Sequence, residues 1–429
     1  MDVAMSYCNA HFEFLKDDGM LQMVLNGIKG PIELSVTKFS EAFSERLGDV
    51  VTNENRKEIV AQDLNLMYLG VLSNSLPVSD YEFVEFPMIE KLPEGVGRIY
   101  EVDMRYGSHL HDRDNDLVLC PYKRKISASE LSPDQQSMLS EMSGDPLLNY
   151  KTCLDFSDRK NLVIHHKALE YYVERGMEVT WVHRAIQFKE EPILDPIVKL
   201  LASLRKKFRD DKLLSHLIKA LAVSIYGCCL KNKSHYSRTQ LSTSVERTRE
   251  LSARYNFLDF EILNPNLVMF QLQKCSYLAD SPFLWALTIL DLSKIALYKG
   301  WNVIQNTFDK PKILMVQTDS IFYAVDLPNN DLFDKLKSMK LDFSNLDKSH
   351  PLYSEENAMK PLVFKLQSEG TCCPHGLIRS VCSLRPKLYS VLYYCNNPKC
   401  EASKTVIKGL TVKEKNYTTH EDYENKLEE

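Results

Sequence analysis

Apolar residues along the chain follow two patterns, one typical of strands and one typical of helices. Four apolar runs are rich in β-branched and aromatic residues, are bounded or interrupted by acidic and turn residues, and predict strands or strand-turn units. They lie at 58–72, 97–105, 162–176 and 312–327. Two longer stretches, 196–227 and 281–304, carry leucines at three- and four-residue spacing and predict helices. Because strands and helices alternate irregularly, the sequence predicts an α+β fold.

Composition places the chain among ordinary folded proteins. Its 429 residues are 44% hydrophobic and 26% charged, which is close to the average for globular domains. No run of about 18 apolar residues occurs and the N-terminus lacks a signal-peptide pattern. We therefore expect an intracellular protein, nuclear or cytoplasmic, without membrane contact. Eleven cysteines spread over a chain of this length are expected to be reduced thiols.

The charge of the chain is distributed unevenly. Between Lys199 and Glu250, twelve Lys or Arg stand against four acids, so this segment carries about eight positive charges in a chain whose total is -5. Such a segment is suited to binding a polyanion, and it is also typical of solvated helix faces. Charge alone leaves both interpretations open.

Two acids interrupt apolar runs at the ends of predicted strands. Asp63 follows an apolar run, and Asp319 lies in a Thr-Asp-Ser turn between two strands of a predicted hairpin. Each has an ordinary interpretation, Asp63 as a helix cap and Asp319 as a turn residue. Two acids on neighbouring strands can also share a pair of divalent ions, which is the arrangement used for in-line phosphoryl transfer. The pair is more informative than either acid alone.

A basic segment lies between these acids. Arg205, Lys212 and Lys219 are spaced by seven residues, so on a single helix they would form a cationic ladder about 21 Å long, able to bind a triphosphate. Tyr226 continues the same stripe, and Gly227 leaves room for close approach of a ligand. The ring of Tyr226 could stack on a base pair or belong to the core.

The order of these residues resembles one family. Asp63 to Tyr68 (D-x-x-x-x-Y), Lys219 to Gly227 (K-x-x-x-x-S-x-Y-G), Thr318 to Ser320 (T-D-S) and Lys387 to Tyr389 (K-x-Y) are similar to motifs A, B and C and the thumb motif of family B DNA polymerases. Further stretches such as GIKGPIELSVTKFSEA resemble the protein-primed branch, which includes Maverick/Polinton transposon, adenovirus-like and linear-plasmid enzymes. The resemblance covers residues 10–425. It implies a right-hand architecture with an antiparallel-sheet palm, helical fingers and a small thumb.

The resemblance implies a role for each matched residue. Asp63 and Asp319 would be the catalytic acids and would bind two Mg2+ ions, and Tyr68 would exclude a ribose 2′-hydroxyl. The residues implied or expected to bind the incoming nucleotide are Tyr68, Arg205, Lys212, Lys219, Tyr226 and Gly227. The residues implied to bind DNA are Ser320, Lys387 and Tyr389.

The resemblance also implies an order of domains and a set of partners. The expected order is a remnant N-terminal region (1–45), palm with motif A (46–126), an insertion (127–198), helical fingers (199–255), palm with motif C (256–345) and thumb (346–429). The expected partners are a DNA primer-template, dNTPs and a terminal priming protein, which the insertion would contact. The implied activity is template-directed DNA synthesis.

Several positions depart from the family pattern. Gln317 replaces the first acid of the usual D-T-D-S, Val223 stands where Asn is usual, Cys228 where Lys is common, and Ser215 where a second Lys would face the triphosphate. The acid-rich exonuclease motifs expected before residue 10 are not found, so the chain is interpreted as a fragment or a decayed copy. A second hypothesis is therefore a degenerate or domesticated nucleic-acid-binding protein without synthesis.

Two other groups were weighed as metal ligands. His109, His111 and Asp112 lie in one segment, and a structural or capping role is favoured over metal binding. The second group consists of Cys372, Cys373, His375, Cys382, Cys395 and Cys400. Its spacing is irregular and it has no C-x-x-C pair, so free thiols are favoured over zinc.

Overall fold

A central antiparallel sheet holds the predicted acids. In the computed structural model, which describes residues 1–141, 150–231, 236–274, 280–369, 376–394, 403–407 and 418–428, its strand order is β1-β13-β14-β3-β15. The strands are β1 (Glu33–Ser35), β13 (Lys312–Gln317), β14 (Ser320–Asp326), β3 (Lys57–Leu64) and β15 (Phe364–Leu366). The hairpin of β13 and β14 has Asp319 in its turn, as the sequence predicts, and β3 pairs with β14 and β15 on either side.

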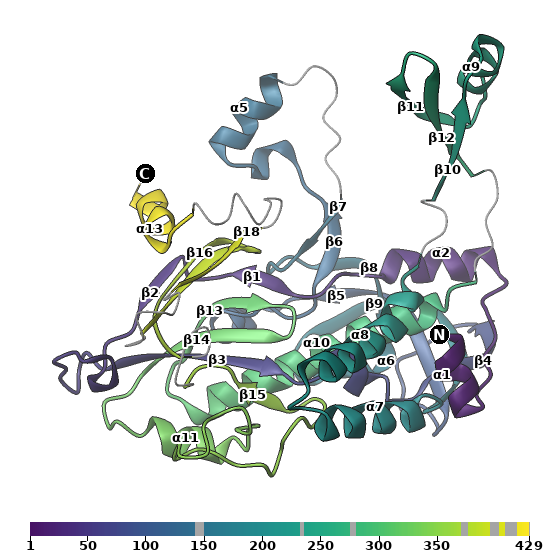
Figure 1. Ribbon diagram of the computed structural model, residues 1–429. Coiled ribbons are helices and arrows are strands. Elements are labelled where there is room, and N and C mark those ends of the chain that lie inside the picture. The colour runs from purple at the N-terminus through teal and green to yellow at the C-terminus, as the bar shows by residue number, and fades with distance from the viewer. Residues whose placement is uncertain are drawn as a thin grey trace.

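A long helix supports this sheet from within the molecule. Helix α10 (Phe283–Thr307) buries most of its residues, including Trp285 and Tyr298. Its close packing against β15 depends on Gly300, because a Cβ there would lie 1.9 Å from the ring of Phe364. Helix α11 (Leu332–Ser338) follows the hairpin, and Figure 1 shows both helices near the central sheet.

A second antiparallel sheet has the strand order β4-β9-β5-β8 and packs against α10. It consists of β4 (Leu76–Phe83), β9 (Glu178–Glu191), β5 (Val96–Arg105) and β8 (Arg159–His165), flanked by α2 (Asp18–Gly27) and α6 (His166–Glu174). The prediction of strand structure throughout 162–176 is therefore wrong after His165. The side chain of His165 caps α6 by accepting from the amide of Lys167, and Gly176, with φ 101°, follows the helix.

The predicted long basic helix is two helices. α7 (Asp195–Lys207) ends at Phe208, and α8 (Lys212–Cys229) begins after Asp211, whose side chain accepts from the amide of Leu214. The helical spacing of leucines continues across the break, which is why the sequence pattern joined the two. Among the described residues, α8 is the helix long and apolar enough to cross a membrane by length and composition, with a mean hydropathy of 1.3, a test that core helices also pass.

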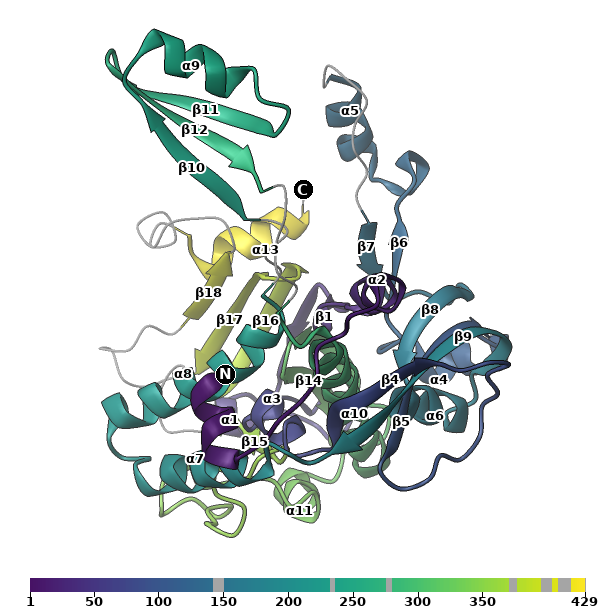
Figure 2. The same cartoon turned by 90° about the vertical axis from the view of Figure 1, so that its right-hand side faces the viewer.

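Two smaller units project from one side of the body (Figures 1 and 2). One is the hairpin of β6 (Tyr122–Lys125) and β7 (Tyr150–Cys153) with the short helices η3 (Ala128–Glu130) and α5 (Pro133–Glu141). The other is a three-stranded sheet, β10-β12-β11, with one helix; its elements are β10 (Ser237–Ser242), α9 (Val245–Ser252), β11 (Phe257–Asn264) and β12 (Leu267–Gln273). The sequence analysis did not predict this second unit, and it occupies part of the range expected to be helical.

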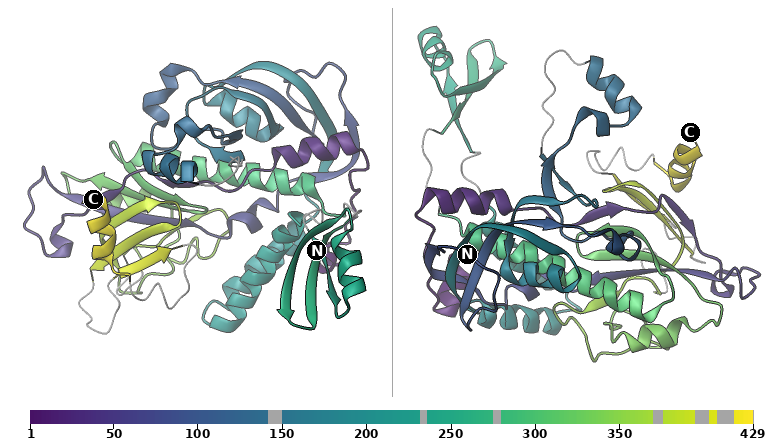
Figure 3. Two further views of the ribbon diagram at one scale, coloured as in Figure 1. Left: turned by 90° about the horizontal axis from the view of Figure 1, so that it is seen from above. Right: turned by 180° about the vertical axis from the view of Figure 1, so that it is seen from behind.

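A fourth sheet lies over the other end of the central sheet (Figure 3). Its order is β18-β17-β16-β2, with β18 (Ser403–Ile407), β17 (Leu388–Tyr394), β16 (Leu377–Arg385) and β2 (Phe39–Glu41). His420 of α13 (His420–Glu428) joins the sheet through contacts of 2.8 Å to the hydroxyls of Ser380 and Ser390. The remaining short elements are α1 (Asp2–Cys8), η1 (Glu45–Leu47), α3 (Met67–Val71), η2 (Ser108–Leu110) and α4 (His111–Asp114).

Candidate active site

The two predicted acids meet at one end of the central sheet. Asp63 on β3 is paired in register with Ser320, the first residue of β14, and Asp319 immediately precedes it in the turn. The hydroxyl of Ser320 donates to Asp63 Oδ1 at 3.0 Å, and the amide of Leu64 donates to the Asp319 carbonyl at 2.7 Å. Acids 256 positions apart in the sequence are thus neighbours because their strands are neighbours.

A cavity of about 90 Å3 lies beside these acids. The residues that line it come from β3, α3, α7, α8, the hairpin turn and β15, and they include Asp63, Tyr68, Arg205, Lys219, Asp319 and Lys365. A larger cavity of about 660 Å3, bordered by α6, α10 and β15, contains none of the predicted site residues. Charged side chains line both cavities, but the two acids and two of the cations that the sequence singled out line the smaller one, so we take that one as the candidate active site.

The carboxylate of Asp319 is unusually hard to ionise. Burial, and then the nearby charge of Asp63, raise its pKa to about 6, while Lys219 and Lys365 act in the opposite direction. Two carboxylates that share a site resist losing both protons unless a cation lies between or beside them. The pair therefore has the electrostatic character of a cation site.

Arg205 brings a positive charge into the same cavity without a partner of its own. Its Nε and Nη1 atoms are buried and have no hydrogen-bond partner among the described residues. Burial lowers the pKa of the guanidinium, and the charge of Asp63 partly offsets that effect. Two buried donors without an acceptor are costly, so this side of the cavity is suited to an anion.

The break between α7 and α8 changes the predicted cationic ladder. Arg205 is on α7 and Lys212 begins α8, so the prediction that Arg205, Lys212 and Lys219 share one helix face is wrong. Asp211 causes the change because it caps a new helix. Arg205 and Lys219 still line one cavity, and Lys212 is not among the residues that line it.

Tyr68 lines the cavity, and a second tyrosine, Tyr226, packs against its ring. Leu66, in the left-handed region at φ 49°, turns the chain from β3 into α3 and places Tyr68 beside the cavity. The ring of Tyr68 stacks on that of Tyr226 from α8. The pKa of Tyr68 is raised to about 12, mainly by burial and secondly by the negative charge of Asp319. A Cβ at Gly227 would meet no atom within 4 Å, so space remains beside the helix there.

The K-x-Y residues lie at the turn of the β16–β17 hairpin. Lys387 has φ 61° and its Nζ is 2.7 Å from Glu33 Oε1, while Tyr389 is buried on β17. Burial and then the charge of Glu33 raise the pKa of Tyr389. The sequence analysis missed Glu33 and also Lys365, whose Nζ lies 3.4 Å from Asp63 Oδ2. Their signals were weak, namely single charged residues within short apolar runs.

The departures from the motif pattern have different settings. Gln317 is buried, and neither atom of its side-chain amide has a hydrogen-bond partner among the described residues. Val223 is half exposed and lines the cavity.

His111 stacks on Phe156 with ring centroids 4.1 Å apart, which agrees with a structural role. Cys382 is a free thiol, as expected, and the other residues of the Cys/His group at 372–400 lie outside the described residues.

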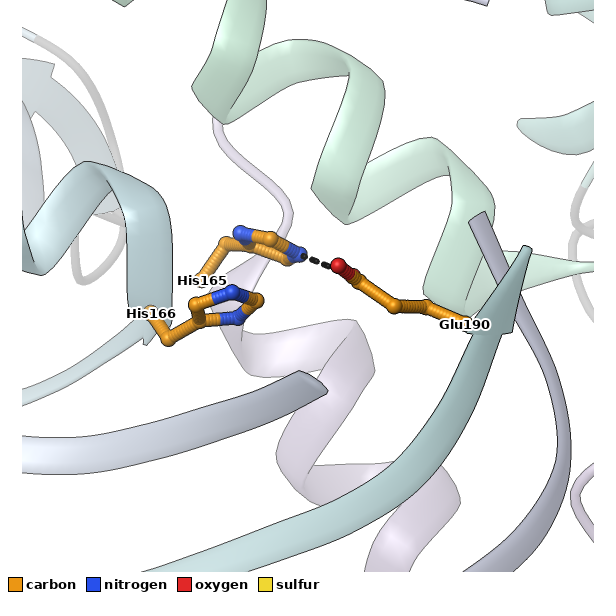
Figure 4. Close-up of side chains that lie close together, drawn as sticks. All are labelled: His165, His166 and Glu190. Atoms are coloured by element: carbon orange, nitrogen blue, oxygen red, sulfur yellow. Dashed lines mark ion pairs between the residues drawn. The ribbon is translucent and has the colours of Figure 1, made fainter. Parts of the chain in front are cut away.

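A buried His/Glu group lies in the second sheet (Figure 4). The candidate ligand atoms of His165, His166 and Glu190 lie within 4.8 Å of one another. However, His165 Nδ1 accepts from the Lys167 amide at 3.3 Å, and His166 Nδ1 accepts from the Arg98 amide at 3.2 Å. A neutral imidazole that accepts at Nδ1 carries its proton on Nε2, so that nitrogen offers a metal no lone pair. We interpret the group as a structural contact.

Comparison with known proteins identifies the fold. No protein-family model and no curated protein matches the chain. Solved structures of a DNA polymerase do match. Phi29 DNA polymerase in an orthorhombic crystal form has a TM-score of 0.58 at 13% identity, over 98% of this chain and 61% of that one. Its complex with primer-template DNA has a TM-score of 0.57 at 12% identity, over 98% and 60%.

A third structure, the ternary complex of Phi29 DNA polymerase with primer-template DNA and incoming nucleotide substrates, has a TM-score of 0.54 at 13% identity, over 98% and 60%. The chain thus has the α+β fold of a DNA polymerase, as the sequence analysis predicts. It spans about three-fifths of the length of Phi29 DNA polymerase.

Proposed function

We propose that the chain is a template-directed DNA polymerase core, which transfers a dNMP from a dNTP to a DNA primer or a priming protein. The observation that carries this proposal is the convergence of Asp63, Asp319, Arg205 and Lys219 on one cavity at the end of an antiparallel sheet. Two acids and two cations in one place are suited to a metal-bound triphosphate. The resemblance of the motifs and the fold support the same assignment.

Asp63 and Asp319 would hold the two Mg2+ ions. Their carboxylate oxygens are the hard ligands that Mg2+ prefers, and the raised pKa of Asp319 supports the proposal, because an added cation would relieve the repulsion from Asp63. When bound, the ions would activate the primer 3′-hydroxyl and offset charge on the phosphates. Ser320 would orient Asp63 through its hydrogen bond and face the primer end.

Arg205 and Lys219 would bind the triphosphate. The unpaired Nε and Nη1 atoms of Arg205 would gain phosphate oxygens as acceptors, which removes the cost of burying them alone. Tyr68 would lie beneath the sugar and exclude a 2′-hydroxyl, and Tyr226 with Gly227 would contact the nascent base pair. Lys212, the first residue of α8, would bind the nucleotide's phosphates at the approach to the site.

Lys387 and Tyr389 would hold the primer terminus and the template. We further propose that the polymerase domains follow the order of the sequence motifs, with a remnant N-terminal region at 1–45, palm at 46–126 and 256–345, fingers at 199–255, and thumb at 346–429. The segment 127–198 would contact a terminal priming protein. The hairpin of β6 and β7, whose first strand ends just before this segment, projects on the side of the molecule where the sheet of β16 and β17 also lies, which supports a contact with DNA or its bound protein (Figure 1).

A second candidate is a nucleic-acid-binding protein without synthesis. Gln317 favours it, because the family motif has an acid where this chain has an amide with two unpartnered atoms. Lys365 also places a cation 3.4 Å from Asp63, in competition with a metal. Both candidates predict DNA binding, and only the first predicts Mg2+-dependent extension.

Primer extension tests the proposal. The wild-type chain should extend a labelled primer on a template in Mg2+, and Asp63→Asn should lose at least about 1,000-fold in rate, as expected when a metal ligand is removed. Asp326→Asn, an exposed acid at the far end of β14, is the matched control and should retain activity. Folded wild-type protein that binds the DNA but makes no product would favour the second candidate.

A further inference from the structure

Glu33 lies in the stretch GIKGPIELSVTKFSEA, outside the four motifs that were given residue roles, and in the structure it lies between two of those motifs. It is the first residue of β1, where its Cα pairs with that of Gln317 across the antiparallel ladder. Directly opposed residues place their side chains on the same face of a sheet. A carboxylate is thus present one strand away from the position where the T-D-S hairpin of this chain carries an uncharged glutamine.

One oxygen of Glu33 joins two turns that are far apart in the sequence. Glu33 Oε1 accepts from Thr318 Oγ1 at 2.9 Å and from Lys387 Nζ at 2.7 Å. Thr318 and Lys387 both have left-handed backbones, with φ of 62° and 61°, so each turn has a defined shape. The carboxylate therefore links the turn that carries Asp319 to the turn that carries the K-x-Y lysine.

Backbone contacts around β1 strengthen this link. The amide of Thr318 donates to the carbonyl of Ile32 at 3.1 Å, so the hairpin turn is attached to the chain beside Glu33. On the other side, Ser35 Oγ donates to the Ser383 carbonyl at 2.5 Å, and Lys38 Nζ donates to the Leu384 carbonyl at 2.8 Å. The β1 segment is thus a bridge between the hairpin turn and the β16–β17 hairpin.

The ion pair is only partly shielded. The side chains of Lys387 and Glu33 are 33% and 25% exposed, so a phosphate from solvent can reach the ammonium. A lysine ammonium has three donors, and a carboxylate already bound to one of them competes with, and repels, an arriving phosphate.

We propose that Glu33 is a positioning residue that holds Lys387 against the Asp319 turn in the free protein and gives up the ammonium when a primer phosphate binds. This inference rests on the proposed DNA-binding role of Lys387. DNA binding then exchanges an internal ion pair for a lysine-phosphate pair. The carboxylate lowers DNA affinity and keeps the lysine in place.

Glu33→Gln separates charge from shape. A glutamine keeps an oxygen that can accept from Thr318, and it removes the negative charge that competes with DNA. Affinity for a fluorescein-labelled primer-template, measured by anisotropy without Mg2+ or dNTP, should rise about threefold to tenfold at about 0.1 M salt.

Two variants show whether the effect passes through Lys387. In a Lys387→Met background, Glu33→Gln should leave DNA affinity unchanged, because the ammonium for which Glu33 and the phosphate compete is gone. Glu178→Gln is the charge-matched control, because it removes the acid of an exposed ion pair with Arg105 at the far end of β9, and it should not alter affinity. Thermal unfolding of each variant confirms that the fold is intact.

The outcomes are distinguishable. Unchanged or weaker DNA binding by Glu33→Gln, or an equal gain in the Lys387→Met background, overturns the role of Glu33. Affinity is measured without nucleotide, so it does not depend on synthesis. Wild-type protein that binds DNA but never extends a primer would refute the polymerase function, and the effect of Glu33→Gln on DNA affinity could still be measured. Wild-type protein without DNA affinity would overturn both.

Discussion

The rings of Tyr68 and Tyr226 stack face to face, with centroids 4.2 Å apart and planes 5° from parallel. Tyr68 is on α3, the helix that follows the Asp63 strand β3, and Tyr226 is in the last turn of α8, so the stack joins α3 to the helix that carries Lys219. Because Tyr68 lines the cavity, a nucleotide whose phosphates lie near Asp63 and Lys219 would place its sugar against this pair.

Removing the ring of Tyr68 should relax sugar selection more than it slows synthesis. A ring in contact with C2′ leaves no room for a hydroxyl, which would lose its water without gaining a partner. Tyr68→Val should therefore gain ribonucleotide incorporation, by about tenfold or more, and keep measurable dNTP use. The measurement is primer extension with each nucleotide type. If the variant excludes NTPs as strictly as the wild type, Tyr68 is a core residue.

Two lysines of α8 should differ in their effect on nucleotide use. Both are exposed, but Lys219 lines the cavity and Lys212 does not. Lys219→Ala should raise the KM for dNTP by about tenfold or more, the loss expected for one charge-assisted phosphate contact. Lys212→Ala removes the same charge from the same helix and should change KM by less than about twofold. Equal effects would mean that the helix contributes only general charge.

The raised pKa of Asp319 predicts a stability that depends on pH. Because the folded chain holds this proton up to about pH 6 and the unfolded chain releases it near pH 4, the free energy of unfolding should fall as pH rises between these values. The total is up to about 3 kcal/mol. In EDTA at pH 7.5, Asp319→Asn should therefore be more stable than the wild type, and the difference should vanish at pH 4. Denaturant unfolding at both pH values measures it, and a variant less stable at pH 7.5 contradicts the burial argument.

Substituting alanine for Gly227 and for Gly300 should have opposite effects on the stability of the fold. A Cβ at Gly227 meets nothing within 4 Å, so Gly227→Ala should stabilise α8 by about 0.5–1 kcal/mol, while reducing synthesis if a base pair lies against it. A Cβ at Gly300 would collide with Phe364, so Gly300→Ala should destabilise by about 1–3 kcal/mol. Thermal unfolding and primer extension check both variants. A destabilised Gly227→Ala would show that the space beside α8 is filled.

The sequence predicted the acids of the site better than it predicted its helices. Asp63 and Asp319 each end or interrupt a strong strand pattern, so their meeting followed from pairing two strands. The break before Lys212 could not be seen, because leucine spacing continues through it and the deciding feature is a single cap, Asp211. Similarly, the apolar run at 162–176 gave no sign that it changes from strand to helix after His165.

The parts that depend on long-range contacts could not be predicted from local patterns. Glu33 lies in a strand of three residues whose partner, Gln317, is 284 positions away. The projecting sheet was missed for another reason. The alternation of apolar and polar residues in β11 is short, at 259–262, and most residues of this strand are exposed. The core of the unit is small and consists of Leu251, Phe270 and Leu272.

The most direct test of the central claim is whether the added nucleotide follows the template. The purified chain is incubated with a labelled primer, Mg2+ and one dNTP at a time on four templates that differ only in the first unpaired base. The account predicts that each template directs the complementary nucleotide, and that Asp63→Asn and Asp319→Asn add none. Addition that ignores the template base, or that survives both substitutions, would contradict the assignment of this site to DNA synthesis.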